Sequence, residues 1–163
     1  MFRCRRRRDF DRRCQAIIES LPIRFPFELG AFLADVGKQR GVPIELWRMT
    51  PQRPDRTGMM VRACQRVYVF VASRTDPLHV SHIAFHELGH LLLGHASNRE
   101  CTAPGRGPGG THEVEEDHAE RFAHLLSARV RDGAWRDRAR MSRQQLELRA
   151  AFGSRRYLCG GYA

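Results

Sequence analysis

Apolar side chains recur at helical spacing over the first forty residues, and this pattern predicts two amphipathic helices. The first covers residues 9–21 and ends at Pro22, after an Arg-rich start that we expect to be disordered. The second covers residues 26–40, with Pro26 near its first turn and Gly41 just past its end.

The middle of the chain changes to patterns typical of β-strands. Residues 42–47 and 59–63 read as short strands on either side of a loop over residues 50–57 that contains Pro and Arg. Residues 67–72 are continuously apolar, which predicts a central strand buried on both faces of its sheet. Because only residues 64–66 separate the last two strands, we expect those strands to form an antiparallel hairpin.

The second half returns to helical spacing. A helix over residues 76–95 is apolar over most of its circumference, so it must be buried. A further helix over residues 113–131 ends at Gly133. Between the two, residues 96–111 are too rich in Gly and Pro for regular structure, and a loop of that length inside a domain is usually functional or mobile.

Residues 142–152 form the last predicted helix, with Ser142 and Gln145 as a capping box and Gly153 as its terminator. The order of elements indicates an α+β fold, in which helices pack on a short three-stranded sheet around the buried helix at 76–95. A chain of 163 residues with 42% hydrophobic content fits one domain of ordinary size.

The composition is strongly basic, with a formal net charge of +10 and Lys38 as the only lysine. Such a charge fits a solvated arginine surface, which we favour, or an anionic partner such as nucleic acid. The five cysteines are scattered and contain no Cys-x-x-Cys pair, which favours a reducing compartment. The sequence has neither the features of an export signal nor an apolar run of membrane-spanning length, so we expect a cytoplasmic protein without a membrane partner.

The helix over residues 76–95 contains the sequence His86-Glu-Leu-Gly-His90. Histidines at positions i and i+4 direct both imidazoles at one point, where they can hold a metal ion. Glu87 can then take a proton from water activated there, which is the pattern of a metal-dependent hydrolase. Two other interpretations stay open: His82 could pair with His86 instead, or the histidines could be core residues hydrogen-bonded to backbone or carboxylate groups.

A catalytic zinc needs a third protein ligand and an open position for water. His95 follows on the same segment, but the metzincin pattern would need glycine at position 93 and histidine at position 96. The chain has Leu93 and Ala96 there, so we exclude His95.

The predicted helix over residues 113–131 offers carboxylates for the same purpose. Glu116 and Glu120 lie four residues apart at the edge of its apolar stripe, where a ligand should be. Glu113 is the next candidate, and Glu115 points away and is expected to be solvated. An acidic first turn that favours the helix dipole would explain the same residues without a metal.

Two stretches of the chain together resemble the ImmA/IrrE family of bacterial and phage metallopeptidases, which are gluzincin-like. They are His86-Glu-Leu-Gly-His-Leu-Leu-Leu-Gly-His95 and Glu116-Asp-His-Ala-Glu-Arg-Phe-Ala-His-Leu-Leu126. The second stretch follows the family motif Glu-x-x-Ala-(Asn/Asp)-x-Phe-Ala except at Glu120, where the family usually has Asn or Asp to hydrogen-bond a ligand histidine.

The resemblance extends over residues 26–131 and implies a zincin-like metallopeptidase domain there. Residues 1–25 would form a basic arm with a short helix, and residues 132–163 a C-terminal helix and basic tail packed on the same domain. The resemblance implies zinc, or manganese, as the metal.

In that family pattern the metal is held by His86, His90 and Glu116, and Glu87 is the catalytic base. The implied function is a regulatory endopeptidase that cleaves a helix-turn-helix transcriptional repressor. Because residues 1–25 are too short for a DNA-binding domain of that kind, the repressor is expected to be a separate protein.

Two other functions compete with this one. The departure at Glu120 favours a regulatory protein of the same fold that sequesters a transcription factor without cleaving it. The Arg-rich residues 1–13 favour a basic protein associated with nucleic acid.

Overall fold

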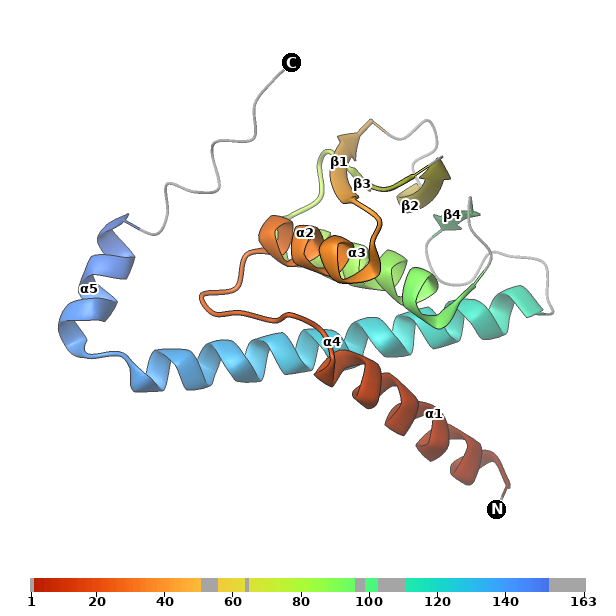
Figure 1. Cartoon of the computed structure of the whole chain (residues 1–163), viewed down its shortest axis with the longest axis horizontal. Coiled ribbons are helices and arrows are strands. Elements are labelled where there is room, and N and C mark those ends of the chain that lie inside the picture. The colour runs from red at the N-terminus through yellow and green to blue at the C-terminus, as the bar shows by residue number, and fades with distance from the viewer. Residues whose placement is uncertain (1, 51–55, 64, 96–98, 103–110, 153–163) are drawn as a thin grey trace.

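The computed structural model describes residues 2–50, 56–63, 65–95, 99–102 and 111–152. Figure 1 shows how its elements are arranged. In chain order they are α1 (Phe2–Glu19), α2 (Leu29–Arg40), β1 (Ile44–Met49), β2 (Arg56–Ala63), β3 (Arg66–Ala72), α3 (Pro77–Leu93), β4 (Arg99–Thr102), α4 (Thr111–Arg140) and α5 (Arg143–Phe152). The expected α+β class is confirmed.

The strands form one mixed sheet in the order β1-β3-β2-β4. β3 pairs in parallel with β1, from Ile44 opposite Val67 onward, and antiparallel with β2. The predicted hairpin is therefore confirmed, and β3 lies inside the sheet as expected.

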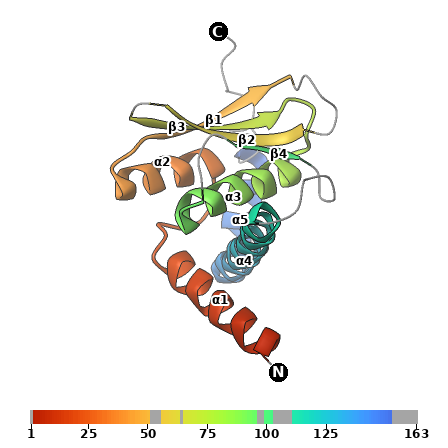
Figure 2. The ribbon, with the colours of Figure 1, turned by 90° about the vertical axis from the view of Figure 1, so that its right-hand side faces the viewer.

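Three layers are visible in Figure 2: the sheet, then α2 and α3, then α4 with α1. α3 lies between the sheet and α4, so it is covered from both sides. This position explains why a helix with Ile83, Phe85 and Leu88 almost fully buried is apolar over most of its circumference.

The expectation that the central strand is buried on both faces is wrong. Val67, Val69 and Val71 are buried, whereas Tyr68 and Phe70, which alternate with them, are only partly buried. Helices α2 and α3 cover one face of the sheet only (Figure 2), so the strand has one covered and one uncovered face.

The predicted starts of α3 and α5 are confirmed. The side chain of Asp76 accepts hydrogen bonds from the backbone N–H groups of Leu78 and His79, whereas α3 ends at Leu93, before the predicted end at His95, with Gly94 in the left-handed conformation. Ser142 and Gln145 exchange the two hydrogen bonds of a capping box. Gly153 lies outside the described residues.

The first two helices begin at other positions than expected. α1 begins at Phe2, so the segment expected to be disordered is helical, in keeping with the high helix propensity of arginine. α2 begins at Leu29 rather than near Pro26, although Gly41 ends it as predicted.

The described residues 99–102 within the stretch over residues 96–111 form a strand that the sequence did not predict. This strand, β4, pairs antiparallel with β2. Its backbone N–H and C=O groups form hydrogen bonds with the edge of β2 that β3 leaves unpaired. Because backbone groups make this pairing, the hydrophobicity of the side chains does not reveal it.

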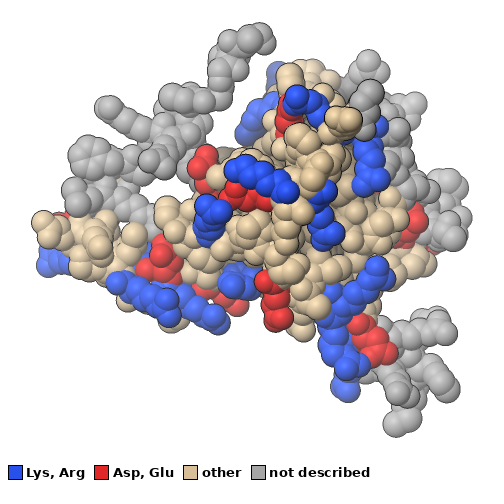
Figure 3. Space-filling view, viewed as in Figure 1, with Lys and Arg blue, Asp and Glu red and all other residues tan. Residues whose placement is uncertain are grey.

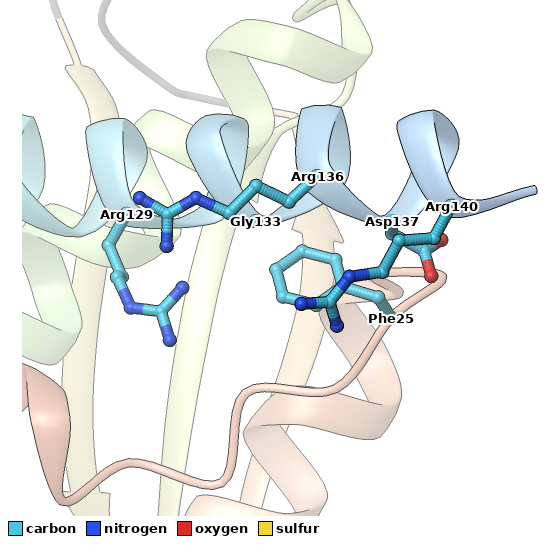
Figure 4. Close-up of a pocket in the computed structure, with 6 residues that line it drawn as sticks. All are labelled: Phe25, Arg129, Gly133, Arg136, Asp137 and Arg140. Atoms are coloured by element: carbon cyan, nitrogen blue, oxygen red, sulfur yellow. The ribbon is translucent and has the colours of Figure 1, made fainter.

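Gly133 does not end α4, which continues to Arg140. A Cβ atom at this position would lie 2.0 Å from Cζ of Phe25, so the glycine makes room for an aromatic ring. Figure 4 shows that ring against the helix, where it lines a pocket of about 230 Å³ with Arg129, Arg136 and Arg140. Gly133 therefore has a packing role.

Candidate metal centre

The structure brings His86, His90 and Glu116 together. α3 carries the two histidines on successive turns, and α4 carries the glutamate opposite them. Within the described residues, these three form the group of potential ligands whose donor atoms all lie within 4.8 Å of one another. Nε2 of His86 lies 3.1 Å from Nε2 of His90 and 3.2 Å from Oε2 of Glu116, and His90 Nε2 lies 3.5 Å from Glu116 Oε1.

These separations fit a tetrahedral metal ion. Ligand atoms about 2.0–2.1 Å from a common centre at tetrahedral angles lie roughly 3.3 Å apart. The distance between the two Nε2 atoms, and the distances from Nε2 of His86 to Oε2 and from Nε2 of His90 to Oε1 of Glu116, bracket that value. Two imidazole nitrogens with a carboxylate are a donor set that zinc prefers.

Close packing of α3 on α4 sets this geometry. A Cβ atom at Gly89 would lie 3.2 Å from the carbonyl oxygen of Ala119 and 3.2 Å from Cδ1 of Phe122. Small residues at the crossing point therefore let the two backbones approach closely, one residue before His90 and three residues after Glu116.

The group is buried on one side and open on the other. The side chain of His90 is 3% exposed, that of His86 14% and that of Glu116 26%. Glu116 is therefore the member of the group that is most exposed to solvent.

Each histidine has a partner at its second ring nitrogen. Glu120 Oε2 lies 3.3 Å from Nδ1 of His86, and Nδ1 of His95 lies 3.0 Å from Nδ1 of His90. A carboxylate at Nδ1 keeps the proton there and leaves Nε2 for a metal. Glu120, at which the chain departs from the expected pattern, therefore contacts one of the two candidate ligand histidines.

Local charges favour a protonated His86 beside an ionised Glu116, so a metal ion would have to displace the proton from His86. Burial alone would lower the pKa of His86, but its hydrogen bond with Glu116 and the charge of Glu87 raise it above the usual value. Burial opposes ionisation of Glu116, yet hydrogen bonds with His86 and His90 hold its pKa well below the usual range. The carboxylate is therefore ionised at neutral pH, as a metal ligand must be.

His95 has the opposite environment. Burial and the neighbouring charge of His90 lower its pKa to about 4, so its ring is neutral at pH 7. A neutral ring can accept a hydrogen bond at Nδ1 from the Nδ1–H of His90. His95 thus lies outside the ligand group and beside one of its members.

Glu87 is 1% exposed and lies beneath the sheet. A Cβ atom at Gly58 of β2 would lie 2.8 Å from Glu87 Oε1 and 2.4 Å from Cγ2 of Ile83. The absence of a side chain at Gly58 therefore provides the space that the Glu87 carboxylate occupies.

The other candidates from the sequence lie outside this group. Glu113 is exposed and Glu115 is half-buried. His82 contacts Glu120, with Nε2 3.1 Å from Oε1. The pocket beside Phe25 begins at Arg129, thirteen residues and about 20 Å further along α4 than Glu116, so it is separate from the candidate metal centre.

Three contributors to the site were missed in the sequence. Gly58 has no signal there, because its role depends on how the sheet lies against α3. His95 was considered there only as a metal ligand, and its contact with His90 was not predicted. Gly89 lies inside the motif, and a small residue next to a ligand on a buried helix is a cue for close helix packing.

Fold and site define an α+β protein in which two histidines and a glutamate form a group that could hold a metal ion. No protein-family model and no curated protein matches the chain in sequence.

Proposed function

We propose that this chain is a zinc-dependent endopeptidase of the ImmA/IrrE type. The observation that carries the proposal is the convergence of His86, His90 and Glu116 at separations that fit a tetrahedral ion. A buried carboxylate on the residue after the first histidine completes the set of groups that peptide hydrolysis by a gluzincin needs.

His86, His90 and Glu116 would hold the metal, which supplies a Lewis acid and lowers the pKa of water in the site. Glu87 takes a proton from water as the oxygen attacks the peptide carbonyl, and passes that proton to the nitrogen of the leaving amine. Glu120 and His95 hold the two imidazoles in the orientation that presents Nε2.

The proposed substrate is a helix-turn-helix transcriptional repressor supplied as a separate protein, and the proposed compartment is the cytoplasm. The substrate rests on the resemblance of the two motifs, and the compartment rests on the five scattered cysteines without a Cys-x-x-Cys pair. Among the helices of the described ranges, none has the length and apolarity needed to cross a bilayer.

The test compares the wild type with Glu87→Gln on purified repressors, after both are loaded with zinc to equal content. We expect cleavage by the wild type and a loss of at least about a hundredfold in the variant, the scale of general-base catalysis. Equal cleavage would remove the role assigned to Glu87. Tight binding of a repressor without cleavage by either protein would favour the sequestering function instead.

A basic surface supports an anionic partner as a second candidate. Figure 3 shows Lys and Arg side chains over α1 and along the C-terminal half of α4, and Arg12, Arg13, Arg129, Arg136 and Arg140 are all exposed. If this surface binds DNA, affinity must fall steeply with salt, and Arg12→Glu with Arg136→Glu must weaken binding and reduce the salt slope. A salt-independent or unchanged affinity would exclude it.

A further inference from the structure

A second group of histidine and glutamate side chains lies one helical turn away from the candidate metal centre. Nε2 of His82 lies 3.1 and 3.2 Å from the two oxygens of Glu120, and Nε2 of His124 lies 3.0 Å from Oε1 of the same carboxylate. The ring centroids of the two histidines are 5.2 Å apart. Two imidazoles from different helices therefore converge on one carboxylate.

Both groups take two side chains from one helix and one from the other, but α3 and α4 change roles between the two groups. In the first group, α3 supplies a pair of ligands at i and i+4, and α4 supplies a single one. In the second, α4 supplies the pair Glu120 and His124, and α3 supplies His82. The exchange follows from antiparallel packing, since His86 meets Glu116 while His82, one turn earlier, meets Glu120.

We propose that His82, Glu120 and His124 form a second site for a divalent transition-metal ion such as zinc. Two imidazole nitrogens and a carboxylate oxygen are a donor set for this class of ion, and a fourth position is left for water. To complete it, the ring of His124 has to turn toward His82, which its 61% exposure allows.

The second site differs from the first in exposure and therefore in affinity. The side chains of His82 and Glu120 are 28% and 40% exposed, whereas His90 in the first group is 3% exposed. Exposed ligands are less fixed before binding, so the second ion binds more weakly and exchanges faster.

Glu120 joins the two sites. Its Oε2 lies 3.3 Å from Nδ1 of His86, while its Oε1 faces His82 and His124. An ion at the second site draws charge from the carboxylate that supports His86, so occupation of one site changes the affinity of the other, and the effect is reciprocal.

The test is titration of the full chain with zinc alone, followed by calorimetry and by competition with a chelating dye. We expect two equivalents in the wild type, one tight and one weaker. His124→Ala removes the weaker equivalent and keeps the tight one, and His82→Ala does the same. Asp117→Asn, which removes an exposed carboxylate from the same helix, keeps both.

A wild type that binds a single equivalent, or a His124→Ala variant that still binds two, would overturn the second site. His90→Ala separates this result from the proposed function, because it removes the tight equivalent and leaves the weaker one. Unchanged far-UV circular dichroism verifies that each variant is folded.

Discussion

Replacement of Gly58 by alanine tests how the sheet holds the carboxylate of Glu87. The added Cβ atom would lie 2.4 Å from Cγ2 of Ile83 and 2.8 Å from Oε1 of Glu87. An ordinary contact between carbon atoms is about 3.5–4.0 Å, so at least one neighbour must move by about 1 Å.

Neither neighbour can move freely. Ile83 is 5% exposed and β-branched on a helix, which restricts its side chain to one main rotamer. The Glu87 carboxylate is equally enclosed, so we expect the strain to divide between a shift of α3 and displacement of that carboxylate. Overpacking of this kind costs about 1–3 kcal/mol.

Urea denaturation measures the predicted loss, with Gly30→Ala as the matched control because no atom lies within 4 Å of a Cβ atom there. We expect Gly58→Ala to lower the free energy of unfolding by about 1–3 kcal/mol. It should also reduce turnover while zinc content stays at the wild-type level. If Gly58→Ala matched the control in stability, the close approach of β2 to Glu87 would be refuted.

Three further predictions concern packing, acid stability and metal affinity. Gly133→Ala should destabilise the wild type, because its Cβ atom would clash with Phe25, but it should stabilise a Phe25→Ala variant by up to about 1 kcal/mol, because alanine has the higher helix propensity. Thermal unfolding of the wild type, the two single variants and the double variant measures the coupling energy between the two positions, and additive effects would contradict the contact. Two hydrogen bonds from Arg121, at 2.8 and 2.7 Å, lower the pKa of Asp11 against the opposing effect of burial. The ionised carboxylate therefore stabilises the fold above the ordinary pKa, and this contribution is lost as pH falls through the lowered value. Asp11→Asn should cost about 1 kcal/mol at pH 7, and this cost should disappear as the pH falls through the lowered pKa. A cost independent of pH in urea denaturation would argue against the ion pair. Glu120→Ala should weaken tight zinc binding by about 10–100-fold, measured by chelator competition, and unchanged affinity would mean that the contact with His86 does not support the metal.

Local signals in the sequence predicted much of the fold. The start of α3 follows from Asp76 and Pro77, and the hairpin of β2 and β3 follows from two apolar runs with a short connection. These features depend on residues that are close together in the chain, so they can be predicted from the sequence alone. The two motifs likewise contain His86 and Glu116, which the fold brings together.

The errors arose where distant parts of the chain decide the structure. Gly133 resembles a helix terminator until Phe25, more than a hundred residues earlier, is seen to pack on it. β4 forms because β2 has a free edge. An apolar run at 67–72 indicates burial, but only the position of α2 and α3 determines which face of the strand is covered.

The central claim is that Glu116 completes a metal site with His86 and His90. The most direct measurement is the amount of zinc retained after desalting by the wild type, Glu116→Ala and Glu113→Ala, which removes an exposed carboxylate one turn earlier on the same helix. We expect one tightly held equivalent in the wild type and in Glu113→Ala, and its loss in Glu116→Ala. Full retention by Glu116→Ala would contradict the assigned ligand set.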